Sequence, residues 1–261
     1  MTNDQEPGTV AEAPGEIHFT SFQGEIEMFK KNLFSYWMLV VILTSFGSFA
    51  YAKPIGLALV LDESGSISST NWDLQVNAYA NVLNSALIAT DGSLQIGVWK
   101  FDQSVEQVFA PTLIDDASDK TALVAAINGM IQGGGSTAIG DAVTTAFSAF
   151  NALGLSNFEK VIIDVSTDGV SNFGSNPTTA SNNAISNGAS AVNCIAIGSG
   201  ANCNWNPVGS LDFFATSFSD FEDALKVKIA TEINTIPEPA SLALLGIGLA
   251  GLGFTRRRKR A

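Results

Sequence analysis

The sequence places a carboxylate and two hydroxyls at alternate positions directly after a short apolar run. The run covers residues 55–61, and Asp62, Ser64 and Ser66 follow it around the flexible Gly65. Oxygen groups of this kind suit a hard cation such as Mg²⁺, which binds few protein ligands and keeps several waters. The same residue types are also frequent caps where a strand turns into a helix. Taken by itself, this stretch is therefore compatible with a metal site and with a helix cap.

Two further stretches favour the metal site. Residues 133–141 form a glycine-rich loop that runs into a predicted helix and carries the hydroxyl of Thr137. Residues 161–169 contain a second apolar run, which ends at the carboxylate of Asp168. Ligands of open α/β sheets bind at the carboxyl ends of the strands, so polar groups gathered there indicate a binding site.

Together the three stretches closely resemble the metal-ion-dependent adhesion site of von Willebrand factor type A (vWA) domains. That family's pattern is Asp-x-Ser-x-Ser, a distant Thr after glycines, and Thr-Asp-Gly after a strand. The resemblance covers roughly residues 53–233. It implies a site for Mg²⁺ or Mn²⁺ in which the three hydroxyls bind directly and the two carboxylates bind directly or through water. The implied metal ligands are Asp62, Ser64, Ser66, Thr137 and Asp168.

Apolar runs and helical periods alternate along the rest of this region. Such alternation predicts an α/β domain with a doubly wound, mostly parallel sheet and helices on both faces. Two consecutive strands, joined by a hairpin at residues 102–104, allow one antiparallel edge strand. The expected strands are residues 55–61, 94–101, 105–113, 160–168 and 192–197. The expected helices are residues 72–88 (capped by Ser69 or Thr70), 118–131, 138–153, 178–189 and a last helix that a capping-box pattern at 219–222 opens and that runs to about residue 233.

The N-terminal region has the pattern of a secretory signal. Residues 1–27 are polar and acidic, and we expect them to be disordered or to precede the true start at Met28. Residues 28–52 combine two lysines, a short apolar core and an Ala-x-Ala exit, which is typical of a cleaved signal peptide. The alternative is a membrane anchor, but the core is short for a span of about 20 residues. The mature vWA-like domain is thus expected at residues 53–236.

The C-terminal region, residues 237–261, begins with Pro-Glu-Pro and continues into an apolar segment and a basic cluster. This order resembles the bacterial PEP-CTERM sorting signal, and the resemblance implies recognition by an exosortase-type enzyme. It also implies a transmembrane helix before processing, and a final location at the cell surface, outer envelope or extracellular matrix of a Gram-negative bacterium. A plain membrane anchor is the alternative, because a basic flank fits both.

Charge and residue types exclude several functions. The chain has 261 residues and a formal net charge of −12, and residues 53–236 hold 18 acidic residues against 6 lysines. Such a domain repels phosphate backbones, so no nucleic-acid partner is expected. The only histidine, His18, precedes the predicted cleavage site, which leaves no base for Ser-His-Asp catalysis. Cys194 and Cys203 are too few for a zinc site and are expected to form a disulfide after export.

The aromatic residues are expected to pack in the core rather than to bind a ligand. They are Trp72, Trp99, Phe213, Phe214, Phe218 and Phe221.

Two functional hypotheses from different classes remain. The favoured one is a non-enzymatic adhesion module in which a carboxylate of a protein or other ligand completes the Mg²⁺ coordination. The alternative is a metal-dependent hydrolase in which the same cation activates water. That alternative needs a general base beside the metal, and the candidates are carboxylates such as Glu63 and Asp141.

Overall fold

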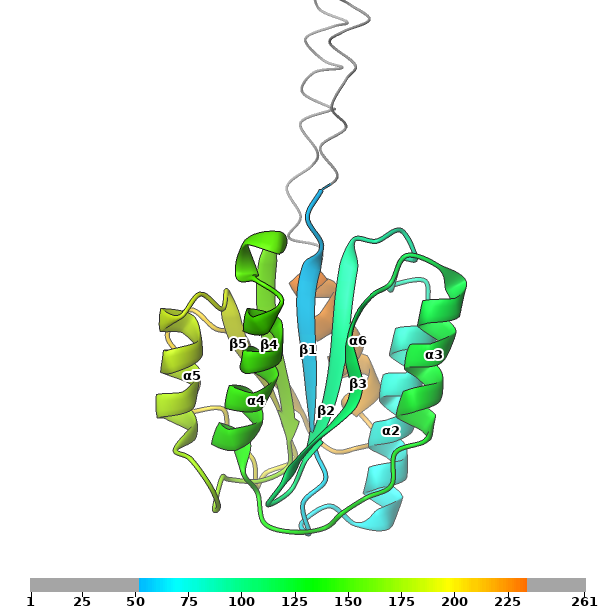
Figure 1. Ribbon diagram of the computed structural model, residues 1–261. Coiled ribbons are helices and arrows are strands. Elements are labelled where there is room, and N and C mark those ends of the chain that lie inside the picture. Colours follow the sequence, from blue (N-terminus) through cyan, green and yellow to red (C-terminus); the bar gives the residue numbers. More distant parts are fainter. Residues whose placement is uncertain (1–51, 234–261) are drawn as a thin grey trace, which may run out of the picture. The chain divides into compact units, whose positions relative to one another are not determined.

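The computed structural model describes residues 52–233 (Figure 1). The predicted N-terminal segments, apart from Ala52, and the predicted sorting signal at residues 237–261 lie outside the described residues. Within residues 52–233, no helix is both long enough and apolar enough to cross a membrane. The transmembrane helix predicted in the sorting signal therefore stays a prediction.

A six-stranded sheet forms the middle layer of the domain (Figure 1). Its strand order is β3-β2-β1-β4-β5-β6, and every neighbouring pair is parallel except β2 and β3. The predicted mostly parallel sheet with one antiparallel edge strand is therefore confirmed. The strands are β1 (Ile55–Asp62), β2 (Leu94–Phe101), β3 (Val105–Leu113), β4 (Lys160–Thr167), β5 (Ala191–Ile197) and β6 (Asp212–Ala215).

Side chains of the central strand β1 alternate between two hydrophobic layers. Leu57, Leu59 and Leu61 pack with α2, α3 and α6 on one face of the sheet. Ala58 and Val60 pack with α4 and α5 on the other face, which is the nearer face in Figure 1. Burial on both faces explains the unbroken apolar run. The helices are α2 (Ser69–Asn84), α3 (Ala117–Asn128), α4 (Ile139–Ala152), α5 (Pro177–Ser186) and α6 (Phe221–Ile233), with a 3₁₀ helix η1 (Leu155–Asn157).

The start of α2 differs from the prediction. The helix begins at Ser69, three residues before the expected start, and its cap is Ser68 rather than Ser69 or Thr70. The Ser68 hydroxyl accepts a hydrogen bond from the backbone N–H of Asn71 at 3.3 Å, which satisfies one of the unpaired donors of the first turn.

The start of α6 does not use the predicted capping box. The Ala224 N–H donates to the Asp220 carbonyl at 3.3 Å, so Asp220 is the residue from which the helix starts. The Glu222 carboxylate accepts a hydrogen bond from Asn81 of α2 at 2.9 Å instead of reaching back to Ser219. Glu222 therefore joins two helices rather than capping its own.

The short edge strand β6 has no counterpart in the prediction. It alternates between exposed and more buried residues, so it lacks the apolar run by which the other strands were predicted. Alternation also turns Phe214 outward, and with 58% of its surface exposed it is not a core residue as expected. Phe213 packs at the edge of the core, whereas the remaining predicted core aromatics are buried: Trp72, Trp99, Phe218 and Phe221.

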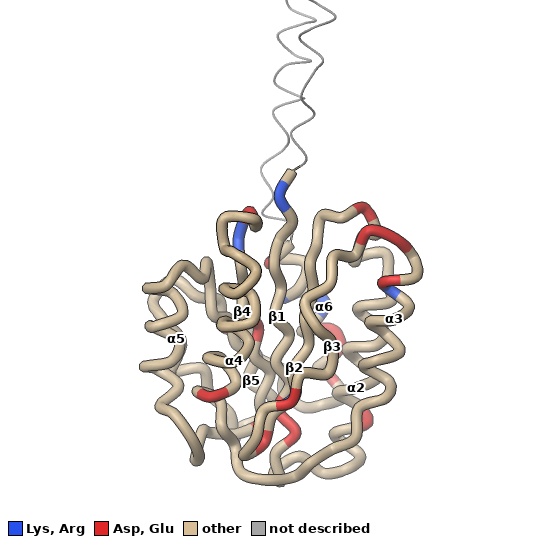
Figure 2. Tube along the Cα trace, viewed as in Figure 1, with Lys and Arg blue, Asp and Glu red and all other residues tan. Residues whose placement is uncertain are grey.

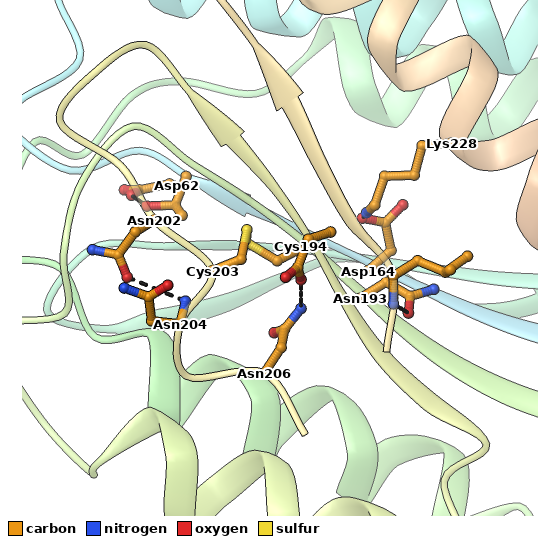
Figure 3. The surroundings of a disulfide bond; sticks show 12 residues. Asp62, Asp164, Asn193, Cys194, Asn202, Cys203, Asn204, Asn206 and Lys228 are labelled. Carbon is orange, nitrogen blue, oxygen red and sulfur yellow. Dashed lines mark hydrogen bonds and ion pairs between the residues drawn. A yellow bond between two sulfur atoms is a disulfide. The ribbon is translucent and has the colours of Figure 1, made fainter. Parts of the chain in front are cut away.

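An ion pair is buried where α6 covers the sheet. The carboxylate of Asp164, in β4, contacts the ammonium group of Lys228, and neither side chain is exposed to solvent. Glu232 lies one turn further along α6, with 3.7 Å between its Oε1 and the Lys228 Nζ. Asn193 of β5 donates to the same Glu232 oxygen at 2.7 Å. Figure 3 shows the Asp164 and Lys228 side chains directed toward one another.

Candidate metal site at the carboxyl edge of the sheet

Asp62 is the last residue of β1, and its side chain is completely buried. One carboxylate oxygen accepts a hydrogen bond from the Ser64 backbone N–H at 2.8 Å, and the other accepts one from the Thr167 hydroxyl at 2.6 Å. The Gln75 side chain, from α2, donates to the Asp62 carbonyl at 2.8 Å. Three uncharged donors therefore hold Asp62 in place, two at its carboxylate and one at its backbone carbonyl.

The two serines link Asp62 to the end of the neighbouring strand β4. Ser64 and Ser66 lie with their hydroxyl oxygens 3.1 Å apart. The Ser66 hydroxyl donates to the carboxylate of Asp168 at 2.6 Å, across 102 residues of sequence. Asp168 directly follows β4, which is paired with β1, so the parallel register brings the two carboxylates to one edge.

The glycine-rich loop lies against the serine loop through its backbone. Gly65 N–H donates to the Gly135 carbonyl at 2.9 Å, and Gly134 N–H donates to the Glu63 carbonyl at 3.1 Å. A Cβ atom at position 65 would lie only 2.9 Å from the Gly134 carbonyl oxygen. This close approach requires glycine at position 65, because any side chain would push the two loops apart.

Thr137 closes the site from the glycine-rich loop. Its backbone N–H donates to the Asn172 side chain at 2.8 Å, and its carbonyl accepts the Asn172 N–H at 3.0 Å. A Cβ atom on Gly169 would lie 3.7 Å from the Ser66 hydroxyl oxygen and 3.9 Å from that of Thr137. The five residues expected to bind metal therefore gather at one edge of the sheet.

Glu63, one of the two candidate general bases, is used for another purpose. Its carboxylate pairs with Lys100 of β2 at 3.0 Å and accepts the Gly133 backbone N–H at 2.7 Å. Asp102, which the sequence patterns did not single out, accepts the Gly135 N–H at 3.0 Å. The carboxylates of Glu63 and Asp102 therefore hold the backbone of the glycine-rich loop in position.

Asp141, the other candidate base, lies in the first turn of α4, and its carboxylate accepts a hydrogen bond from the Ser175 N–H at 3.0 Å. It fixes the loop between β4 and α5. The structure therefore gives loop-holding contacts to both carboxylates that were considered as bases.

The electrostatics of the site fit a bound cation. Burial raises the pKa of the Asp62 carboxyl to about 6, although hydrogen bonds from Ser64 and Thr167 partly offset this effect. Burial also raises the pKa of Asp168 above its usual value. Among residues 52–233, neither carboxylate takes part in an ion pair, since those ion pairs join Lys100 and Lys228 to other acids. Two carboxylates and three hydroxyls form an oxygen donor set that suits Mg²⁺ or Mn²⁺.

The loop between β5 and β6 forms a further wall beside Asp168. A disulfide joins Cys194, inside β5, to Cys203 in this loop, with 5.8 Å between the Cα atoms (Figure 3). A Cβ atom on Gly200 would lie 3.3 Å from the Asp168 carbonyl oxygen, so the loop passes close to the backbone of this site residue. The disulfide thus ties a loop at the site to the interior of the sheet.

A separate acidic cluster lies at the opposite edge of the sheet. Asp115, Asp116 and Asp119 surround the start of α3, where their carboxylate oxygens come within 4.8 Å of one another. Figure 2 shows acidic segments at both edges. Asp116 caps α3 by accepting the N–H groups of Ser118 and Asp119, so this cluster has a structural role at a helix start.

The fold is that of vWA domains. Similar solved structures include proximal thread matrix protein 1 of the mussel byssus, with a TM-score of 0.58 and 24% identity over 68% of this chain and 47% of that protein. They also include a von Willebrand factor type A protein of Catenulispora acidiphila, with a TM-score of 0.57 and 15% identity over 70% of this chain and 43% of that protein. A third is the pilus adhesin SpaC of Lactobacillus rhamnosus GG, with a TM-score of 0.56 and 18% identity over 70% of this chain and 30% of that protein. The chain therefore spans about half the length of the byssus protein, and less of SpaC.

Within that class, the chain belongs to a particular family. A family model described as "Protein of unknown function (DUF1194)" matches residues 54–237, which is more than half of the chain. A PEP-CTERM protein-sorting motif matches residues 235–259, so the resemblance of the C-terminal region to that signal is confirmed. A search of the curated proteins found no match.

Proposed function

We propose that this protein is a metal-dependent binding module that recognises a carboxylate of a partner molecule. Asp62, Ser64, Ser66, Thr137 and Asp168 would hold Mg²⁺ or Mn²⁺ at the carboxyl edge of the sheet. The observation that carries the proposal is the convergence of two buried or half-buried carboxylates with three hydroxyls, without a basic partner within residues 52–233. A further structure of the byssus protein is described as having a zinc-occupied MIDAS motif, which supports a metal in this type of fold.

The donor set decides what a bound cation would do here. Three of the five ligands are neutral hydroxyls, so a divalent ion would keep much of its positive charge and supply an electrophilic centre for an anionic ligand. Asp62 is fixed by Ser64 and Thr167, and Asp168 by Ser66. These bonds orient the carboxylates before any ion arrives, which lowers the cost of assembling the site.

Binding is favoured over hydrolysis by the positions of the acidic side chains. A hydrolase of this type needs a base within reach of a water held at the site. Glu63 is paired with Lys100 and Asp141 holds the Ser175 loop. The proposed activity is therefore non-enzymatic.

The proposed location follows from the sorting motif at residues 235–259. A PEP-CTERM signal, together with the signal peptide expected at residues 28–52, supports export to the cell surface, outer envelope or extracellular matrix of a Gram-negative bacterium. An exosortase-type enzyme would be the partner of the C-terminal segment, and the module would act outside the inner membrane.

A capture experiment from the producing cells tests the proposal. The tagged protein, isolated with Mg²⁺, should retain one or more envelope components that are lost when a chelator is added. An Asp168→Ala variant should retain none of them in Mg²⁺, whereas Asp115→Ala, in the other acidic cluster, should behave as wild type. Retention that is equal with and without chelator would contradict a metal-dependent module.

A further inference from the structure

The loop that follows Asp168 exposes two large apolar side chains beside the candidate site. Val170 is 57% exposed and Phe173 is 50% exposed, although backbone hydrogen bonds join this loop to Thr137. We call the side chains of Val170 and Phe173 the apolar rim. Large apolar side chains that cluster in the open at one place often mark an interaction surface.

The position of the apolar rim next to Thr137 is set by hydrogen bonds. The backbone N–H of Phe173 donates to the Thr137 carbonyl at 3.2 Å, and the hydroxyl of Ser171 donates to the same oxygen at 3.2 Å. Val170 follows Gly169, where an added Cβ atom would lie 3.7 Å from the Ser66 hydroxyl oxygen and 3.9 Å from that of Thr137. The apolar rim is therefore carried by a loop whose backbone is held against Thr137.

The charges around the site limit the kind of ligand that fits. The loops at this edge, residues 63–68, 129–138, 168–176 and 198–211, contain no lysine or arginine. Lys100 reaches the edge from β2, but Glu63 and Glu106 each pair with it at 3.0 Å. A metal ion would thus be the one unpaired positive charge available to a ligand among these described residues, in a domain that is otherwise acidic.

From the rim and the charges together, we propose that the site recognises a protein segment with a single carboxylate flanked by apolar side chains. This inference rests on the proposed function and adds the chemistry of the partner to it. A second acidic group beside the first would meet the acidic domain without a basic partner, and its repulsion is not offset. Apolar neighbours of the carboxylate would instead cover the apolar rim and remove its surface from water.

Immobilised synthetic peptides test the inference with the purified protein in Mn²⁺. The main probe is a blocked peptide with one aspartate between two leucines. The comparison probes replace both leucines with serine or with glutamate, or replace the aspartate with asparagine. The leucine peptide should bind about tenfold more tightly than the serine peptide, a difference of about 1.4 kcal/mol. The glutamate and asparagine peptides should bind more weakly still. Trigalacturonate, which carries carboxylates among hydroxyls, serves as the polysaccharide probe in competition.

Matched variants separate the apolar rim from general effects of removing exposed apolar groups. Val170→Ser and Phe173→Ser should each weaken binding of the leucine peptide about fivefold and leave binding of the serine peptide unchanged. Their controls are Val227→Ser on α6, where Val227 is 59% exposed, and Phe214→Ser on β6, where Phe214 is 58% exposed. Both controls should bind as wild type, and melting curves verify that all four variants are folded.

A separate Mn²⁺ titration tells failure of this inference from failure of the proposed function. If Mn²⁺ binds but the leucine and serine peptides bind equally, or the rim variants match their controls, the inference is wrong and the metal site stands. A stronger response to trigalacturonate than to the leucine peptide also overturns it in favour of a polysaccharide partner. If Mn²⁺ does not bind at all, the proposed function fails and the inference fails with it.

Discussion

Asp62 and Asp164 are two fully buried aspartates on neighbouring strands, and their surroundings differ in one respect. Asp164 faces Lys228, a cation supplied by the chain itself. Among residues 52–233, the side chain of Asp62 has only neutral donors, namely the Ser64 N–H and the Thr167 hydroxyl. A buried carboxylate without an opposite charge is costly. The comparison teaches that the protein neutralises one aspartate internally, and it motivates our proposal that a cation from outside neutralises the other.

The largest expected effect concerns the internal pair. Asp164→Ala should lower the free energy of unfolding by about 3 kcal/mol, because Lys228 would stay buried with only the more distant Glu232 beside it. Urea unfolding measures this loss, and it should be the same with Mg²⁺ and with chelator. The double variant Asp164→Leu with Lys228→Met should recover most of it, since a buried ion pair is often replaceable by apolar groups. A loss below about 1 kcal/mol in Asp164→Ala would show that the pair is not structural.

The disulfide beside the site has the next largest expected effect. Replacing Cys194 and Cys203 together by alanine should lower the free energy of unfolding by roughly 2–3 kcal/mol. The disulfide closes a short loop in the unfolded chain, and this restriction of the unfolded state would be lost. Mass spectrometry of the exported protein without reduction should find it two hydrogens lighter than the dithiol form. Two free thiols in freshly exported protein would contradict the prediction.

The pH dependence of stability sharpens the comparison at Asp62. Its pKa in the folded metal-free protein is about 6, above the value of roughly 3.9 in an unfolded chain. Between these values the folded state holds more protons, so stability in chelator should fall as pH rises from about 4 to 6. Asp62→Asn should lack this fall and be about 1–2 kcal/mol more stable than wild type at pH 7 in chelator. Melting curves of the two proteins are compared at each pH, because the difference in their stability removes the contribution of the other titratable groups. If the wild type were instead more stable than Asp62→Asn at pH 7 in chelator, the ionised carboxylate of Asp62 would be stabilised within the metal-free protein, which would contradict the prediction.

A smaller effect is expected at the neutral ligand Thr137. Thr137→Ala should weaken Mn²⁺ binding about tenfold, or about 1.4 kcal/mol, without abolishing it. Thr144→Ala is the matched control, because the Thr144 hydroxyl bonds only to the Gly140 carbonyl of its own helix at 2.9 Å. Calorimetric titration compares the two. Equal affinities would remove Thr137 from the proposed ligand set.

The sequence predicts the strands β1 to β5, but it predicts neither the short edge strand β6 nor the internal ion pair. The runs around β1, β2 and β4 are buried on both faces, so their apolar pattern is complete. The strand β6 is short and half-exposed, which leaves no comparable pattern. Lys228 and Asp164 are 64 residues apart, and nothing local to either indicates that α6 brings them together.

The gathering of the site residues was also predictable, because each follows a strand end or the glycine-rich loop. The roles of Asp102 and Glu63 in holding that loop were not. Both bonds depend on how the loop crosses the ends of β1 and β2, at Gly135 and Gly133. Such contacts follow from the packing of segments distant in sequence rather than from a local pattern.

Calorimetric titration of the purified protein with Mg²⁺ and Mn²⁺, joined to melting curves with and without chelator, tests the central claim most directly. We expect saturable binding to the wild type and a stabilisation of roughly 2.7 kcal/mol at a hundredfold excess of metal over the dissociation constant. Asp62→Ala and Asp168→Ala should lose both responses while the metal-free variants stay folded. If the wild type shows neither heat nor stabilisation at millimolar Mg²⁺ or Mn²⁺, the five residues only cap and join loops, and the account of a metal-dependent module is wrong.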